Sequence, residues 1–216
     1  KWRQWQAFAM LIAIRSQPHN LAERIDILDR CCFALTLTSE QRRFADVIGR
    51  KIDRFARGDF GNLGGFVFKQ IQHDKIRNML SSQLPEGGKR STIVRWVEAM
   101  HFGKQAPRYV LDPQSSVEHV YPRNPGQHWT AFEAGLELTR LKALRELLGN
   151  LCVLPRDELG NAGWDEKRRE YMRFKSCKFA QEIAKTKLWT PDIVQSRTSR
   201  LVEATLKFLD LEVEKD

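Results

Sequence analysis

Apolar residues in the first hundred positions of this 216-residue chain recur every three or four residues. Leu21, Ile25 and Leu28, for example, would lie on one face of an amphipathic helix. The same spacing, or a nearly continuous apolar surface, predicts helices over residues 2–14, 20–35, 39–58, 64–80 and 91–102. A turn-rich segment with two glycines, residues 84–90, separates the last two of these helices. The front half of the chain is therefore predicted to be helical.

The pattern changes after residue 107, where short β-prone runs alternate with helical ones. Runs rich in β-branched and aromatic residues predict strands over residues 108–111, 116–122 and 150–155. Helical spacing returns and predicts helices over residues 131–148, 164–174, 176–187 and 192–211. Pro191 stands at the start of the last helix, where its missing N–H costs nothing. We therefore expect a mostly helical α+β protein with a helical front domain, residues 1–107, and a second domain, residues 108–216.

The net charge of +9 lies entirely in the front half. Residues 1–110 contain 19 Lys and Arg against 10 Asp and Glu, whereas the remainder of the chain contains 17 of each. A basic surface attracts polyanions such as nucleic acids. Several of these charges lie opposite the apolar stripe of the helix predicted after residue 39, and we predict that Arg43, Arg50 and Arg54 contact DNA phosphates. A basic face that is merely solvated is the alternative.

The cysteines are typical of an intracellular protein with reduced thiols. Cys31, Cys32, Cys152 and Cys177 form no C-x-x-C motif and have no histidine at zinc-finger spacing. The longest apolar run, residues 7–14, is too short to cross a membrane, and the opening lacks the layout of a signal peptide. We therefore expect a cytoplasmic protein with no membrane segment. Because the first residue is Lys, we also expect a piece of a longer protein.

Four polar residues stand at junctions between the elements predicted for the second half: Glu118, His119, Asn150 and Asn161. A phosphodiester is hydrolysed when a base deprotonates the attacking water while a cation stabilises the charge on the leaving oxygen. Imidazole suits the base because its pKa of about 6.5 leaves it largely neutral at cellular pH. Carboxylate and amide oxygens suit Mg²⁺. These residue types fit metal-dependent phosphodiester hydrolysis, although composition alone does not bring them together in space.

Four short motifs follow one another in this part of the chain. An H-x-x-P motif spans His119–Pro122, and an L-G-N-L motif spans Leu148–Leu151. They are followed by N-x-x-(aromatic)-x-x-K at Asn161–Lys167 and by W-T…R…L at Trp189–Leu201. In this order and spacing the motifs resemble the C-terminal nuclease domain of GmrSD-type restriction enzymes, which belongs to the HNH, or His-Me finger, nucleases. The resemblance covers roughly residues 108–210 and implies a ββα-metal nuclease domain with additional C-terminal helices.

The resemblance implies a role for each candidate residue. His119 would be the general base, Asn150 would brace the loop and hold His119 in place, and Asn161 would be a metal ligand. Glu118 matches the position of an acidic metal ligand, and the metal would be Mg²⁺, for which Mn²⁺ can substitute. Neighbours on a regular strand point to opposite faces, so Glu118 and His119 serve one site only if the strand ends or bulges there. Pro122 favours such an ending.

The function that the resemblance implies is metal-dependent hydrolysis of DNA, by nicking or cutting, in bacterial defence against phage or modified DNA. The family joins this domain to a nucleotide-using sensor, on the same chain or on a partner chain. No P-loop occurs in these 216 residues, which agrees with a nuclease part separated from its sensor. The alternative is a non-catalytic module that binds nucleic acid through a nuclease-like fold.

Several of these residues also have purely structural interpretations. Asn150, which follows Gly149, could be a helix C-cap, and Asn161 could be an N-cap or a turn residue. Lys167 and Arg168 are predicted to contact DNA phosphates, although they could instead form a solvated helix face. Three tryptophans are predicted to lie in the core: Trp129, Trp164 and Trp189.

Overall fold

The computed structural model describes residues 18–38, 57, 73–102, 108–112, 114–155 and 159–209. The chain divides into two compact units, residues 1–76 with 206–216, and residues 77–205. The predicted helix over residues 2–14 and the segment that carries Arg43, Arg50 and Arg54 lie outside the described residues.

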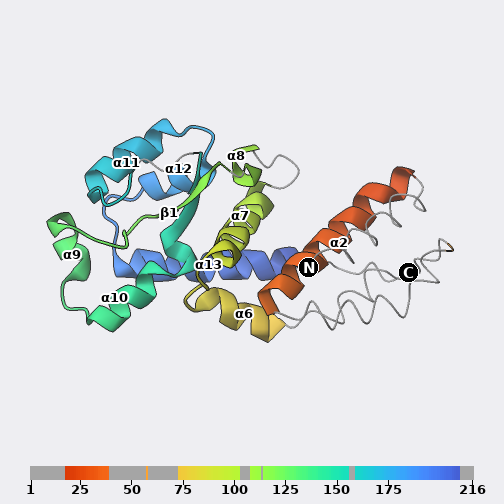
Figure 1. The fold of residues 1–216 in the computed structure, drawn as a ribbon, viewed down its shortest axis with the longest axis horizontal. Coiled ribbons are helices and arrows are strands. Elements are labelled where there is room, and N and C mark those ends of the chain that lie inside the picture. Colours follow the sequence, from red (N-terminus) through yellow and green to blue (C-terminus); the bar gives the residue numbers. More distant parts are fainter. Residues whose placement is uncertain are drawn as a thin grey trace. The chain divides into compact units, whose positions relative to one another are not determined.

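The described residues form helices together with one small sheet (Figure 1). The α-helices are α2 (Pro18–Thr38), α6 (His73–Ser81), α7 (Gly88–Phe102), α8 (Arg108–Leu111), α9 (Thr130–Glu133), α10 (Leu138–Arg145), α11 (Trp164–Arg173), α12 (Lys178–Ala184) and α13 (Pro191–Leu209). The strands are β1 (Ser116–His119) and β2 (Leu151–Leu154), and the 3-10 helices are η2 (Gln127–Trp129) and η3 (Leu148–Asn150). The predicted class, α+β and mostly helical, is confirmed for this part of the chain.

In the first unit, α2 is a helix of 21 residues that contains the helix predicted over residues 20–35. Ile27 and Phe33 on this helix are buried, whereas Ile25 is 39% exposed. Arg30 Nη1 donates a hydrogen bond of 2.8 Å to the carbonyl of Phe208, in the last turn of α13. The Arg30 guanidinium also lies 4.1 Å from the centre of the Phe208 ring. This contact fastens α2 to the C-terminal end of the unit.

In the second unit, the two strands pair antiparallel, with Ser116 opposite Leu154 and His119 opposite Leu151. All four residues of β2 are buried, because α7, α8 and α12 pack against this strand. The N–H of Val153, on β2, donates to Glu98 Oε2 on α7 at 2.9 Å, and not to another strand. A side chain thus satisfies backbone that a third strand would otherwise cover.

The start of β2 is fixed by a close approach of two backbones. A Cβ on Gly149 would lie 2.0 Å from the carbonyl oxygen of Val194 and 2.5 Å from Thr198 Oγ1, both on α13. Gly149 N donates to that same Thr198 Oγ1 at 2.9 Å. Only glycine fits this position, because any side chain would separate β2 from α13.

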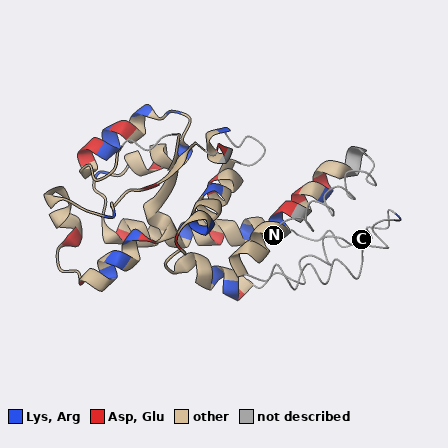
Figure 2. Cartoon of the chain, viewed as in Figure 1, with Lys and Arg blue, Asp and Glu red and all other residues tan. Residues whose placement is uncertain are grey.

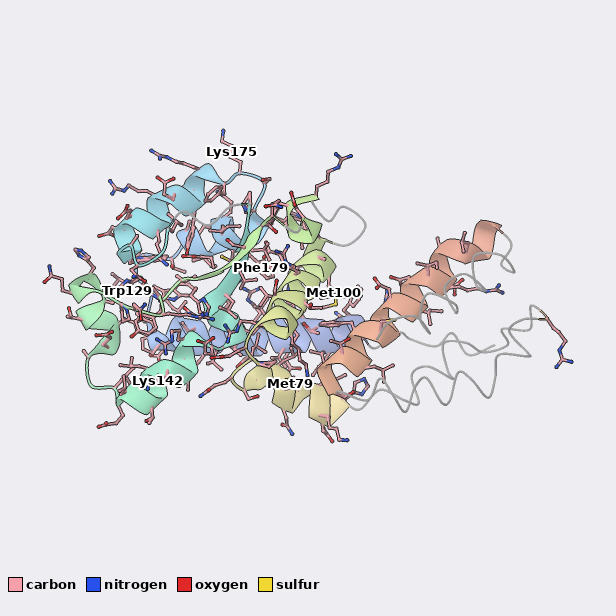
Figure 3. All side chains as sticks on the ribbon, viewed as in Figure 1. Met79, Met100, Trp129, Lys142, Lys175 and Phe179 are labelled. Carbon is pink, nitrogen blue, oxygen red and sulfur yellow. The ribbon has the colours of Figure 1, made fainter. Side chains whose placement is uncertain are left out.

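Aromatic side chains fill the interior of the second unit. Tyr121 stacks on Phe132, with ring centres 4.2 Å apart, and Trp129 meets Tyr121 edge to face at 5.5 Å. Trp164 and Trp189 stack at 5.6 Å. Trp129 and Phe179 are labelled among these side chains in Figure 3, and both are buried. The prediction that Trp129, Trp164 and Trp189 belong to the core is therefore confirmed.

The strand predicted over residues 108–111 is wrong, because this segment forms the single helical turn α8. Its contacts explain the difference. Tyr109 Oη donates to Glu98 Oε1 at 2.7 Å, and the carbonyl of Val110 accepts a hydrogen bond of 2.9 Å from Arg95. Tertiary contacts with α7 thus override the β propensity of a four-residue run.

The helix predicted over residues 131–148 is also interrupted. Gly135 adopts φ 72°, a left-handed conformation that ends α9, and α10 begins only at Leu138. The other boundaries follow the sequence pattern more closely. The predicted strands over residues 116–122 and 150–155 contain β1 and β2, and Pro191 opens α13.

Candidate active site

His119 lies at the end of β1 with its imidazole half-buried. Its Nε2 lies 3.2 Å from Glu146 Oε2, within hydrogen-bonding distance. Glu146 follows the last residue of α10, and its own side chain is 14% exposed. The end of a strand and the end of a helix, 27 residues apart in sequence, thus bring an imidazole and a carboxylate together.

Two arginines approach the same carboxylate. Arg90 Nη2, from the first turn of α7, lies 2.8 Å from Glu146 Oε2, and Arg145 Nε lies 3.6 Å from Glu146 Oε1. Arg90 is almost fully buried, with 4% of its surface exposed. Glu146 therefore links His119 to two cationic side chains.

The environment of His119 favours the neutral ring. Burial lowers the pKa of His119 below its ordinary value, the hydrogen bond to Glu146 partly opposes this shift, and Arg123 and Arg90 lower the pKa further. A carboxylate accepts a hydrogen bond, so Nε2 of the neutral ring carries the hydrogen and Nδ1 carries the lone pair. No described residue is a hydrogen-bond partner of Nδ1. The arrangement leaves a basic nitrogen available for chemistry.

A polar cavity of about 420 Å³ lies beside the imidazole. It is lined by Gly87, Arg90, Ser91, Val117, Glu118, His119, Pro122, Arg123, Asn124, Gly160 and Asn161. Asn161 is exposed and stands in the turn before α11. The structure thus brings His119 and Asn161, 42 positions apart in the sequence, to the wall of one cavity.

Asn150 is fully buried and uses its whole side-chain amide. Its Oδ1 accepts hydrogen bonds from Tyr121 N at 2.8 Å and Trp189 Nε1 at 3.1 Å. Its Nδ2 donates to the carbonyls of Tyr121 and Arg145, each at 2.9 Å. Asn150 therefore braces the backbone two residues after His119, and its amide bonds to Tyr121 rather than to the histidine itself.

Glu118 makes a buried ion pair. Its Oε1 lies 2.5 Å from Lys167 Nζ and accepts a hydrogen bond of 3.4 Å from Tyr171 Oη. Lys167 Nζ also donates to the carbonyl of His119 at 2.7 Å. Lys167 has no exposed surface, so its ammonium holds the end of β1 and does not lie where a duplex could reach it. This placement differs from the predicted DNA contact by Lys167, since α11 turns this residue inward.

Arg168 is half-buried, and its Nε donates to the carbonyl of Ala184 at 2.9 Å, which ties α11 to α12. Acidic and basic side chains both occur along α11, with Asp165 and Glu166 in its first turn (Figure 2). Arg43, Arg50 and Arg54, the other predicted DNA contacts, lie outside the described residues.

The W-T…R…L motif, Trp189–Leu201, donates hydrogen bonds to the L-G-N-L motif, Leu148–Leu151. Arg197 Nη1 donates to the carbonyls of Gly149 and Leu151, at 2.7 and 3.0 Å, while Trp189 binds Asn150 as described above. Arg197 is 5% exposed. Hydrogen bonds thus join the segment Trp189–Leu201 to the segment Leu148–Leu151, where β2 begins.

The part of the chain that the structure describes contains no group of three or more His, Cys, Asp or Glu side chains that could hold a metal ion. Asn161 and Glu118 are the predicted oxygen donors, and both line the cavity. None of the described helices has the length and apolarity needed to cross a membrane.

Sequence reasoning missed Glu146 and Arg90. Glu146 sits two residues before the L-G-N-L motif, in a stretch that the apolar spacing assigns to the interior of a helix. Arg90 follows two glycines at a predicted turn, a position that by itself indicates a helix start and no particular chemistry. Neither residue stands at a motif position, and only the fold brings them to His119.

Residues 60–204, about two thirds of the chain, match the family described as "GmrSD restriction endonucleases, C-terminal domain", and the chain belongs to this family. Membership indicates a restriction nuclease that acts on DNA. The match begins before α6 and so includes α7, which carries Arg90. A search of curated proteins gives no match.

Proposed function

We propose that this domain hydrolyses phosphodiester bonds of DNA with His119 as general base and Mg²⁺ as cofactor, for which Mn²⁺ can substitute. The observation that carries the proposal is the contact between His119 Nε2 and Glu146 Oε2, at 3.2 Å, on the wall of a cavity that Asn161 also lines. The domain would cut or nick incoming DNA as the effector of a bacterial anti-phage restriction system in the cytoplasm.

His119 takes the proton of the attacking water at Nδ1. The Glu146 carboxylate accepts the hydrogen on Nε2 and so fixes the tautomer in which Nδ1 is the acceptor. After the transfer, the imidazolium ring faces this carboxylate, which stabilises the charged ring. Glu146 acts through His119 and is therefore a positioning residue.

The oxygen donors at the cavity fit a cation that keeps most of its water. Mg²⁺ commonly takes only one or two ligands from a protein and retains several waters. Asn161 would supply an amide oxygen, and Glu118 would supply a carboxylate if it exchanged its contact with Lys167 for the ion. The bound ion would stabilise negative charge on the phosphate and on the leaving oxygen.

The other residues hold the base in place or grip the substrate. Asn150 and Lys167 fix the backbone on either side of Val120, and so set the position of His119. We propose that Arg43, Arg50, Arg54 and Arg168 bind DNA phosphates. Neutralising the first three together should flatten the salt dependence of DNA binding by roughly one unit of slope for each phosphate that is no longer neutralised. An unchanged slope would assign them to a solvated surface.

In this proposal residues 108–216 carry the base and the metal ligands, and α7, which precedes them in the sequence, contributes to the same cavity. The modification-sensing, nucleotide-using function would belong to another domain or to a partner chain.

The direct test is a plasmid-cleavage assay with Mg²⁺ and with Mn²⁺. Native protein should convert supercoiled plasmid to nicked or linear forms, and EDTA should stop the conversion without lowering the melting temperature. A protein that binds DNA but cuts it with neither metal would be the non-catalytic module. Stoichiometric zinc, with unfolding on chelation, would contradict the proposed cofactor.

A further inference from the structure

The wall of the cavity that α7 forms has the features of an anion site. Gly87, with φ 73°, precedes α7, and Gly87, Arg90 and Ser91 all line the cavity. The N–H groups of a first helical turn have no acceptor within the helix, and the positive end of the helix dipole lies there. Ser91 N, which donates to the carbonyl of Gly87 at 3.3 Å, begins the intrahelical series. Gly87, the residue before the helix, has no side chain that could accept hydrogen bonds from the N–H groups of the first turn.

A second feature at this wall is the buried guanidinium of Arg90. Its Nη2 lies 2.8 Å from Glu146 Oε2 as an ion pair without the geometry of a hydrogen bond, and the guanidinium carries five N–H donors. Its Nε and Nη2 are both buried and have no hydrogen-bond partner among the described residues. A buried cationic donor of this kind at the edge of a cavity is available to a ligand with several acceptor oxygens.

Positive charge exceeds negative charge around this wall. Arg123 is exposed at the cavity, and Arg145 accompanies Arg90 at the single carboxylate of Glu146. The carboxylate that lines the cavity itself, Glu118, is paired with Lys167. The positive side chains around the cavity therefore outnumber the carboxylates, and an anion that enters meets a net positive field.

We propose that the N-terminus of α7, together with Arg90 and Arg123, binds a phosphate group of the DNA strand next to His119. The identification of the phosphate as one of DNA rests on the proposed function, whereas the anion site itself rests on α7 and the two arginines. Helix α7 would then hold the substrate at the point where the base acts. The non-bridging oxygens would accept hydrogen bonds from the first-turn N–H groups and from the guanidinium groups.

The test measures binding without metal and without cleavage. Native protein in EDTA is titrated with inorganic phosphate, with the dinucleotide dTpdT and with thymidine, and binding is followed by calorimetry or by NMR. Phosphate and dTpdT should bind in competition with each other, and thymidine should bind much more weakly. Binding of free phosphate alone, with no affinity for dTpdT, would overturn the assignment to the DNA strand.

Arg123→Gln is the first variant, because this side chain is exposed and its replacement should leave the fold intact. It should weaken dTpdT binding about tenfold, the usual worth of a charge-assisted hydrogen bond. Arg90→Lys keeps a charge beside Glu146 but removes the fork of donors, and it should weaken binding at least as much at an unchanged melting temperature. The matched control is Arg140→Gln, an exposed arginine on α10 that does not line the cavity, and its binding should equal that of native protein.

Native affinity in both Arg123→Gln and Arg90→Lys, or no saturable binding by native protein, would overturn the site. The nuclease proposal is tested separately. Cleavage that requires His119 but ignores Arg123 would reject this site and leave the nuclease standing. Arginine-dependent phosphate binding in a protein that never cuts DNA would do the reverse.

Discussion

The polar groups behind β1 and those around the cavity are used in different ways. Behind the strand, Asn150 makes four side-chain hydrogen bonds, and Lys167 contacts both Glu118 and the carbonyl of His119. At the cavity, His119 has a partner at only one ring nitrogen among the described residues. His119, Asn150 and Lys167 all belong to the four motifs, yet the hydrogen-bonding groups of Asn150 and Lys167 are occupied, whereas one ring nitrogen of His119 is open to a ligand.

This difference separates support from chemistry. A buried polar group whose hydrogen bonds are all made stabilises one backbone arrangement and has nothing left to offer a substrate. A half-buried group with a free acceptor can take a proton. Changes behind the strand should therefore reduce stability, and changes at the cavity should reduce activity while the fold persists.

The largest effect is expected from Gly149→Ala. The added Cβ would meet the Val194 carbonyl at 2.0 Å, so β2 and α13 must move apart. We expect a decrease of about 4 kcal/mol or more in the free energy of unfolding, measured by chemical denaturation. The control is Gly126→Ala, which has open space around it and a negative φ, and which should change stability by no more than about 0.5 kcal/mol. Equal stability of the two variants would contradict the packing described for Gly149.

The next effect concerns the ion pair between Glu118, on β1, and Lys167, on α11. Lys167→Met leaves the Glu118 carboxylate buried without its cation and should lower the free energy of unfolding by about 3 kcal/mol. Combining it with Glu118→Gln removes the uncompensated charge, so the double variant should be more stable than Lys167→Met alone. A double variant that is less stable by the sum of both single changes would show that the two side chains do not interact.

A pH effect of about 2 kcal/mol is expected from Glu98, also behind the sheet. Burial raises the pKa of Glu98 from 4.5 to about 7, against the opposing hydrogen bonds from Tyr109 and Val153. The folded protein thus binds this proton more tightly than the unfolded chain. The stabilisation is complete below pH 4.5 and disappears as pH rises through about 7.

Glu98→Gln isolates this contribution, because an amide can accept from Val153 N and donate to Tyr109 Oη without a charge. The difference in unfolding free energy between native protein and the variant should change by about 2 kcal/mol between pH 5 and pH 7, in favour of the variant at the higher pH. If the difference does not vary with pH, the pKa of the Glu98 carboxyl is not raised in the folded protein.

A smaller effect is expected at the cavity from Glu146→Gln. Removal of the carboxylate weakens the control of the His119 tautomer, and we expect cleavage to fall about tenfold, or about 1.4 kcal/mol in the barrier. Because Glu146 raises the pKa of His119, the acidic limb of the pH–rate profile should also move to lower pH. A purely structural role would lower the amount of folded protein without moving this limb.

Much of this arrangement follows from local sequence, and the remainder does not. The strands β1 and β2, the helices α11 and α13, and the candidate His119 are predicted by periodicity and by short motifs. The burial of Lys167 and the pairing of Glu146 with His119 and Arg90 depend on chain segments that are tens of residues apart. These contacts depend on how distant segments pack together, and the local spacing of residues does not predict them.

Two predictions of secondary structure were wrong: the strand over residues 108–111 and the uninterrupted helix over residues 131–148. Residues 108–111 have the composition of a strand, but Glu98 occupies the position at Val153 where a third strand would pair. The break at Gly135 could have been recognised, because glycine inside a helical pattern commonly marks a C-terminal end.

The central claim is that His119 is the general base, and the cleavage rate of folded His119→Ala protein tests it most directly. The rate should fall by about 10²–10⁴-fold with melting temperature and DNA affinity close to native, and added Mn²⁺ should not restore it. The native rate should rise with pH through a single ionisation below the usual imidazole value and then level off, since the pKa of His119 is lowered. A His119→Ala protein that is folded, binds DNA and cuts it at the native rate would contradict the account.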